Sequence, residues 1–187
     1  MDVTTAESLA KESGFEHTAP LDVDGLEFRQ DVRDMCNPEH CTQGYGTSWG
    51  CPPAARPLEE LREKAAQFKQ GILVQTIGQL EDAYDFESVM EAGKKHAQAF
   101  ITLADKMIDE TDDHVMNLGA GSCPRCNPFT MPDGSGCTYP DAPCRYPDRI
   151  IPSMESSGLY VAGECEKNGL RYNNGENTIT FTSCCLF

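Results

Sequence analysis

The chain has 187 residues, of which 39% are hydrophobic, and its formal net charge at pH 7 is −15. Such an acidic chain lacks the basic face that phosphate backbones need, which excludes nucleic acid as an expected partner. The sequence shows no apolar run near the roughly 20 residues of a membrane span and no export signal, so we expect a cytoplasmic protein with no membrane partner.

In the first half of the chain, sequence patterns predict three helices and one strand. The helices are residues 4–13, 26–35 (a short helix or an extended arm) and 57–70, and the strand is residues 72–77. Thr4 or Thr5 is expected to cap the first helix, and Gly14 to end it. Pro57 suits the first turn of the third helix and Gly71 its end.

The second half begins with the longest predicted helix, residues 84–109, followed by a predicted strand at residues 114–118. A strand, a helix and a strand in succession predict a right-handed, parallel β-α-β unit. Two helical turns and a closing strand are expected at residues 152–158, 159–168 and 177–186. The predicted fold class is α/β, a small three- to four-stranded sheet with flanking helices and a cysteine-rich cluster-binding lobe. We expect residues 1–187 to form a single domain.

Ten cysteines are present, and four of them have ligand-like spacing within the loop at residues 121–148: Cys123-x2-Cys126-x10-Cys137-x6-Cys144. Because cytoplasmic thiols stay reduced, this grouping favours metal or redox chemistry over disulfides. Soft thiolates select zinc, Cu(I) or iron–sulfur clusters. Zinc ribbons usually pair two Cys-x2-Cys knuckles, and only one is present, so the spacing favours a [4Fe–4S] cluster over zinc or plain buried thiols.

A second, incomplete set consists of Cys36, Cys41 and Cys51 in the loop at residues 36–53. The sequence leaves open whether any protein side chain provides the fourth ligand of this set. The candidate side chains are Cys165, Cys184, Cys185 and His40. With no protein ligand, an open iron can bind substrate as a Lewis acid, whereas a distant cysteine closes an ordinary electron-transfer cluster. The two adjacent cysteines near the end of the chain must point to opposite faces of their strand, so one can reach a cluster while the other packs.

Several motifs carry a family resemblance. They are Cys41-x3-Tyr45-Gly46-x2-Trp49-x-Cys51-Pro52-Pro53, Pro143-Cys144-Arg145-Tyr146-Pro147-Asp148, Pro152-Ser153-Met154-Glu155-x2-Gly158 and the strand from Glu176 to Thr180. Together they resemble a prokaryotic family of predicted metal-binding proteins, a domain of unknown function, over residues 30–187. The resemblance implies a small iron–sulfur or metal protein and no particular reaction. The chain departs from the pattern at residues 127–136, a longer stretch, and at Ser183-Cys184-Cys185; both departures are candidates for a specialised ligand or substrate contact.

We therefore expect an iron–sulfur protein with two [4Fe–4S] clusters that acts in electron transfer or reductive catalysis under anaerobic conditions. The expected ligands are Cys36, Cys41, Cys51, Cys123, Cys126, Cys137 and Cys144. Two alternatives stay open, a non-redox metalloenzyme with substrate at an open iron of the first set and a zinc-stabilised interaction module. An enzyme of this kind would be an iron–sulfur oxidoreductase or a cluster-dependent lyase or desulfurase. The expected partner is a redox protein or a small-molecule substrate.

Overall fold

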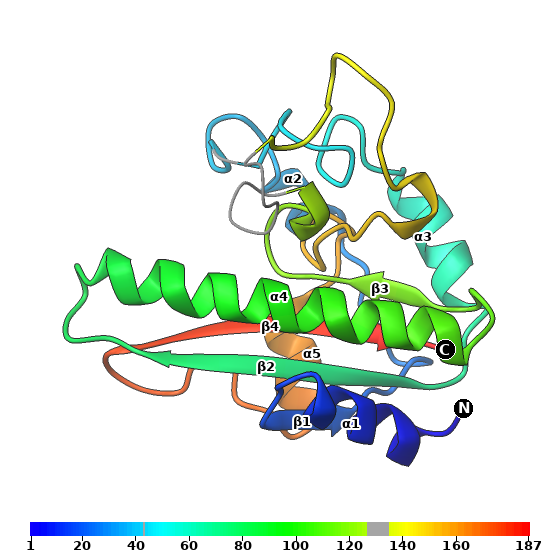
Figure 1. Ribbon diagram of the computed structural model, residues 1–187, viewed down its shortest axis with the longest axis horizontal. Coiled ribbons are helices and arrows are strands. Elements are labelled where there is room, and N and C mark those ends of the chain that lie inside the picture. The colour runs from blue at the N-terminus through cyan, green and yellow to red at the C-terminus, as the bar shows by residue number, and fades with distance from the viewer. Residues whose placement is uncertain (43, 127–134) are drawn as a thin grey trace.

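The computed structural model describes residues 1–42, 44–126 and 135–187. Its body is a four-stranded sheet with the strand order β1-β2-β4-β3. The strands are β1 (His17–Pro20), β2 (Gly71–Gln79), β3 (Met116–Leu118) and β4 (Thr178–Leu186). The helices are α1 (Val3–Glu12), α2 (Gln30–Asp34), α3 (Leu58–Ala65), α4 (Phe86–Glu110) and α5 (Val161–Lys167), with 3-10 turns η1 (Pro124–Cys126) and η2 (Pro147–Arg149). The predicted α/β class, with a small sheet and flanking helices, is confirmed (Figure 1).

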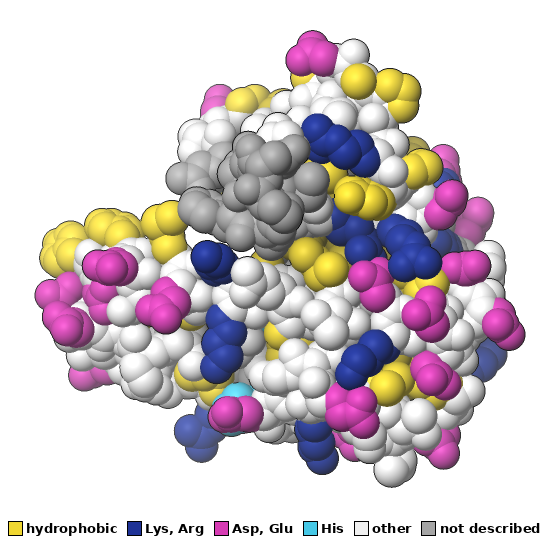
Figure 2. Space-filling model, in the orientation of Figure 1, with side chains coloured by type: hydrophobic (Ala, Val, Ile, Leu, Met, Phe, Trp, Pro, Cys, Tyr) yellow, Lys and Arg dark blue, Asp and Glu magenta, His cyan; other side chains and the backbone are white. Residues whose placement is uncertain are grey.

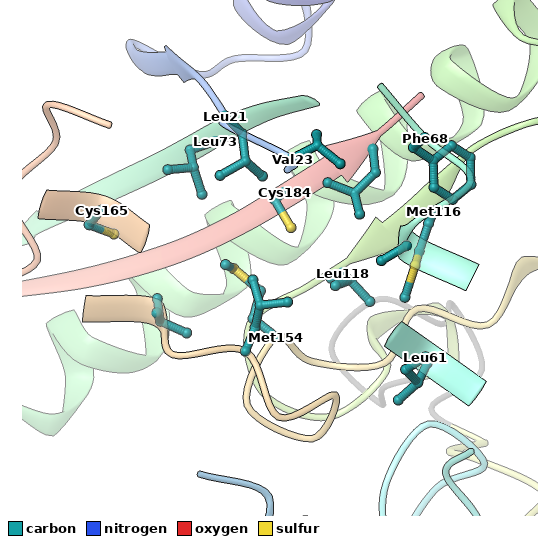
Figure 3. Packing of buried hydrophobic residues seen from close by; sticks show 14 residues of the cluster. Leu21, Val23, Leu61, Phe68, Leu73, Met116, Leu118, Met154, Cys165 and Cys184 are labelled. Atoms are coloured by element: carbon teal, nitrogen blue, oxygen red, sulfur yellow. The ribbon is translucent and has the colours of Figure 1, made fainter. Parts of the chain in front are cut away.

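The sheet has an apolar core on each face because successive side chains of a strand point to opposite sides. Ile72 and Val74 of β2 pack with α1 and α4, while Leu73 between them packs with α3 and α5 on the other face. In β4, Cys184 belongs to the α3 and α5 side and Cys185 to the α1 and α4 side. Figure 3 shows Cys184 among Leu73, Met154 and Leu118, so the predicted opposition of the two cysteines is confirmed.

The two strands of the predicted β-α-β unit run parallel, as expected, but they are not neighbours in the sheet. β2 and β3 run in the same direction but do not pair, because β4 lies between them and is antiparallel to both (Figure 1). Cys184 of β4 is the partner of Leu73 on one side and of Leu118 on the other. The nine-residue β4 matches the full length of β2, and this long antiparallel ladder takes the central position in the sheet.

Smaller differences concern the ends of elements. Helix α1 begins at Val3 because Asp2, and not a threonine, caps it; the Asp2 Oδ1 atom accepts a hydrogen bond from the Thr5 N–H at 2.8 Å. Helix α3 ends at Ala65, short of the predicted residue 70. Gln70 instead exchanges backbone hydrogen bonds with Phe187 and extends the sheet. Strand β1 was not predicted, since it has four residues and ends in proline.

The two cysteine-rich loops, residues 36–53 and 121–148, lie together beyond the β3 edge of the sheet (Figure 1), and we call them the cysteine lobe. The predicted departure at residues 127–136 falls mostly on residues 127–134, outside the described residues. In the described ranges of the chain, no helix combines the length and apolarity that crossing a bilayer requires.

Candidate metal centre

The four central cysteines surround one narrow pocket in the cysteine lobe. Cys123 and Cys126 come from the segment that follows β3 and contains η1, and Cys137 and Cys144 come from the loop beyond it. The pocket is lined by Cys123, Cys126, Cys137, Cys144, Trp49, Arg125, Tyr146 and Ile150. The structure thus brings the four cysteines of the predicted central set to one pocket.

Backbone N–H groups approach two of these sulfur atoms. The Tyr146 N–H donates to the Cys144 Sγ at 3.4 Å, and the Ile151 N–H to the Cys123 Sγ at 3.5 Å. Burial raises the pKa of Cys123, while the N–H groups of Ile151 and Arg125 and the Arg125 charge lower it. Because N–H donors stabilise a thiolate, this arrangement suits sulfurs that bind metal in the deprotonated form.

An arginine fixes this pocket to the body of the protein. The Arg125 side chain is only 8% exposed, and its two terminal nitrogens contact both carboxylate oxygens of Asp105 on α4, at 2.8 and 3.2 Å. Arg149 contacts the same carboxylate at 3.0 Å. A bidentate arginine–carboxylate pair is rigid, so η1 and its cysteines are held at a defined position on α4.

The first cysteine set is gathered around Gly44. A Cβ atom at Gly44 would lie 2.8 Å from the Cys41 Sγ and 3.8 Å from the Cys51 Sγ, so a larger residue here would have to displace the Cys41 thiol. The Cys51 Sγ also lies 3.7 Å from the Ser122 Oγ. Two of the three predicted ligands therefore share one small space with a hydroxyl group.

Two charged side chains, Arg33 and Glu155, accompany Cys36. Burial raises the pKa of Cys36 to about 11; the Cys41 thiol and the Glu155 carboxylate act in the same direction, and the Arg33 charge opposes them. The Arg33 Nη2 donates to two backbone carbonyls at 3.2 and 3.1 Å, but its Nη1 is buried and has no hydrogen-bond acceptor among the described residues. An unpaired buried donor costs about 1–3 kcal/mol. A negatively charged group bound beside these thiols would accept a hydrogen bond from the Arg33 Nη1 and remove that cost.

Sequence reasoning missed both charged residues. Glu155 lies in one of the motifs that carried the family resemblance, and its place in that motif could have identified it as a site residue. Arg33 precedes Cys36 by three residues and lies in no motif, so its role depends on how α2 packs against residues 55 and 56.

The two cysteine sets are neighbours in space. A Cβ atom at Gly50 would lie 3.2 Å from the Cys123 Cβ, and Cys51 meets Ser122, the residue before Cys123. The Trp49 ring meets the Tyr139 ring edge-on at 5.0 Å between centroids, and its Nε1 donates to the Ala142 carbonyl at 3.3 Å. Two loops that lie about 80 residues apart in the chain therefore form one thiol-rich lobe.

The candidates for a fourth ligand of the first set lie in different surroundings. His40 is exposed, and its Nδ1 lies 3.0 Å from the Asn37 Oδ1. Cys165, Cys184 and Cys185 are fully buried in the cores on the two sheet faces, and the Cys165 Sγ accepts a hydrogen bond from the Gln75 Nε2 at 3.4 Å. Burial raises the pKa of all three thiols, and none of them lines the pocket of the central set. Ligation by any of the four stays a prediction.

Within residues 1–42, 44–126 and 135–187, no three His, Cys, Asp or Glu side chains are arranged to hold a single metal ion. The structure is that of an α/β protein whose described cysteines include two sets that lie next to each other in one lobe. The chain belongs to the family described as predicted metal-binding protein (DUF2284), whose model matches residues 19–187. The resemblance is confirmed, and the match reaches back into β1. Comparisons with curated proteins and with solved structures gave no match.

Proposed function

We propose that the protein binds two iron–sulfur clusters and acts in electron transfer or reductive catalysis. The cysteines that hold them are Cys123, Cys126, Cys137 and Cys144 for one cluster and Cys36, Cys41 and Cys51 for the other. The observation that supports this most directly is the pocket lined by all four central cysteines, next to the loop that carries the other three.

The spacing of the cysteines along the chain favours a cluster over zinc. Four cysteines line one pocket, but the sequence has a single Cys-x2-Cys pair where zinc ribbons usually have two. A zinc ion needs all four sulfurs at one tetrahedral centre. A cubane attaches each cysteine to a different iron, so its ligands stand farther apart. The predicted alternative, a zinc-stabilised interaction module, receives less support from this arrangement.

Residues of the chain provide what such a cofactor requires. Backbone N–H groups of Tyr146 and Ile151 donate to two of the sulfurs, as N–H groups do around cluster sulfurs, and the Trp49 ring lines the pocket. Bound at these sites, iron–sulfur clusters supply one-electron redox chemistry. Because the two sets are in contact through Gly50 and Ser122, an electron that enters at one set has a short route to the other.

A second candidate function follows from the surroundings of the three-cysteine set. The unpaired Arg33 Nη1 and the Glu155 carboxylate lie beside Cys36, where the sequence provides no local fourth cysteine. The Arg33 guanidinium suits the binding of an anionic substrate at this set and would hold its charge, against the opposing charge of Glu155. This reading corresponds to the predicted non-redox metalloenzyme with an open iron, such as a lyase or desulfurase.

The test is metal analysis of protein purified without oxygen, together with visible and electron paramagnetic resonance spectra. We expect about eight irons and eight sulfides per chain, and about half of that in the single variants Cys126→Ala and Cys51→Ala. Val74→Ala, which shortens a buried core side chain of β2 and removes no candidate ligand, is the control and should keep the full content. Zinc without visible absorbance would overturn the proposal. If a small anion shifts the signal that remains in Cys126→Ala, the second candidate gains support; an unchanged signal counts against it.

A further inference from the structure

A large groove adjoins the cysteine lobe and belongs to neither cysteine set. It has a volume of about 880 Å³ and lies between α3, the segment that leads into β3, and the loop around η2. β3 is the edge strand of the sheet, so its outer side has no strand partner and faces this groove. Pockets for small organic molecules have volumes of about 300–1,000 Å³, a range that includes this groove.

The charge of the groove is opposite to that of the chain. Four cationic residues line it, against two carboxylates, in a protein whose net charge is −15. The cations are Arg56, Lys64, Arg125 and Arg149, and the carboxylates are Asp113 and Asp148. In Figure 2, Lys and Arg side chains gather beside apolar ones where the lobe meets the body. An excess of positive charge in a hollow attracts an anion and concentrates it there.

Two of these cations remain available to a ligand. Lys64 has no carboxylate partner among the described residues, and burial together with the nearby Arg56 charge lowers its pKa. Arg56 pairs with Glu60 at 3.6 Å, but both side chains are exposed, and such a pair contributes little. Arg125, by contrast, is fully engaged with Asp105. Lys64 and Arg56 are thus two like charges close together whose one carboxylate partner, Glu60, is exposed and weakly held, and they favour the binding of an anionic group between them.

Apolar side chains line the groove beside these cations. Leu61, Val115 and Ile151 belong to the lining, and Trp49 lies at the end next to the lobe. An inorganic ion alone would leave this apolar surface uncovered. The lining therefore suits an organic body that carries an oxyanion, either a carboxylate or a phosphate.

The groove is directly next to the pocket of the central cysteines. Trp49, Arg125 and Ile150 line both spaces, so a molecule in the groove would contact side chains that also border the four thiols. We propose that the groove is the binding site of a small organic anion, held by Lys64 and Arg56, and that this anion is the substrate served by the central cluster. The assignment of the anion as substrate depends on the proposed function; the binding site itself does not.

Calorimetry on the cluster-loaded protein tests the binding site. The probes are phenyl phosphate and benzoate. Inorganic phosphate is the control that lacks an organic body, and phenethylammonium is the control that carries the opposite charge. We expect saturable binding of one phenyl phosphate or benzoate per chain, weaker binding of inorganic phosphate and none of the cation. The relative affinities of the first two probes distinguish a phosphate from a carboxylate ligand.

Variants make the test specific. Lys64→Gln and Arg56→Gln should each weaken binding by about tenfold, the usual effect of losing one charge-assisted hydrogen bond. Lys69→Gln is the matched control, since this exposed lysine follows α3 and does not line the groove. Equal affinity in Lys64→Gln and Lys69→Gln, or no saturable binding, would refute the site.

Iron and sulfide are assayed in the same samples, so that the two proposals are tested separately. Clusters without anion binding would refute the groove alone, and anion binding to a zinc-containing protein would refute the cluster alone. Where both are present, the probe should shift the paramagnetic resonance signal of the central cluster in Cys51→Ala protein. An unchanged signal would separate the groove from the cluster and refute the assignment of the anion as substrate.

Discussion

The body and the cysteine lobe are held together in different ways. The body buries apolar side chains on both faces of its sheet, in cores that contain residues such as Phe100, Leu103 and Leu118 at 1% exposure or less. In the described part of the lobe the ordered elements are short turns, with contacts such as the Trp49–Tyr139 ring pair, the hydrogen bond from Trp49 to Ala142 and the ion pair of Arg125 with Asp105 of α4. The comparison indicates that the body is stable through its own packing, whereas the lobe depends on its ligands for order. The following predictions test this division through the free energy of unfolding.

The largest effect is expected from the core on the α4 face. Phe100 is 1% exposed and meets the rings of Phe15 and His96. Phe100→Ala leaves a cavity there and should lower the unfolding free energy by about 3–5 kcal/mol in denaturant titrations. The iron content per folded chain should stay the same. A loss below about 1 kcal/mol would show that the body does not depend on this core.

The next largest effect concerns pH and a buried histidine. Burial lowers the pKa of His96 to about 3; its Nδ1 lies 2.9 Å from the Thr76 Oγ1 and its Nε2 2.7 Å from the Ser183 Oγ. Below about pH 6.5 the unfolded chain binds a proton at this residue while the folded chain does not. The stability that His96 contributes is therefore present above pH 6.5 and decreases as the pH falls towards 3, by about 2 kcal/mol between pH 6.5 and 5.

Denaturant titrations of wild type and His96→Gln across this pH range check the assignment. The variant should show a flatter dependence of the unfolding free energy on pH. His17→Gln, which changes an exposed histidine at the start of β1, should keep the wild-type slope. The same slope in all three proteins would mean that His96 is not the titrating group.

A smaller effect is expected at the buried thiol Cys184. It packs with Leu73 and Leu118 on the α5 face (Figure 3), so Cys184→Ala should cost about 1 kcal/mol of unfolding free energy. If the thiol only packs, the iron content stays unchanged. Cys185→Ala, on the opposite face, is the matched control. Loss of iron in Cys184→Ala alone would make this residue the fourth ligand of the first set.

The smallest effect on the body is expected from Gly44→Ala. Gly44 makes its contacts within the lobe, so the unfolding free energy of the body should change by less than about 0.5 kcal/mol. The new Cβ would displace the Cys41 Sγ, however, and metal analysis should show less iron at the first set. Thr42→Ala, an exposed change in the same loop, should leave the iron content unchanged. A large loss of stability in Gly44→Ala would contradict the separation of lobe and body.

Local patterns in the sequence determined most helices and the presence of the central cysteine set. The period of α4 and the β-rich runs of β2 and β4 are properties of short segments, and the structure places these elements within a few residues of their predicted ends. Cys123, Cys126, Cys137 and Cys144 lie within 22 residues, so chain reversal alone can gather them. The position of β4 between β2 and β3 had no local signal, because strand pairing depends on contacts between distant segments.

Tertiary structure alone decided what surrounds the cysteines. The contact of Gly50 with Cys123, the Glu155 carboxylate near Cys36 and the groove between α3, β3 and η2 each join segments far apart in the chain. A sequence pattern can state which side chains are able to bind a metal, since that follows from residue type and short spacing. The packing of the lobe against α3, α4 and β3 decides which charged side chains and which groove lie next to the cysteines. That packing is a property of the whole fold.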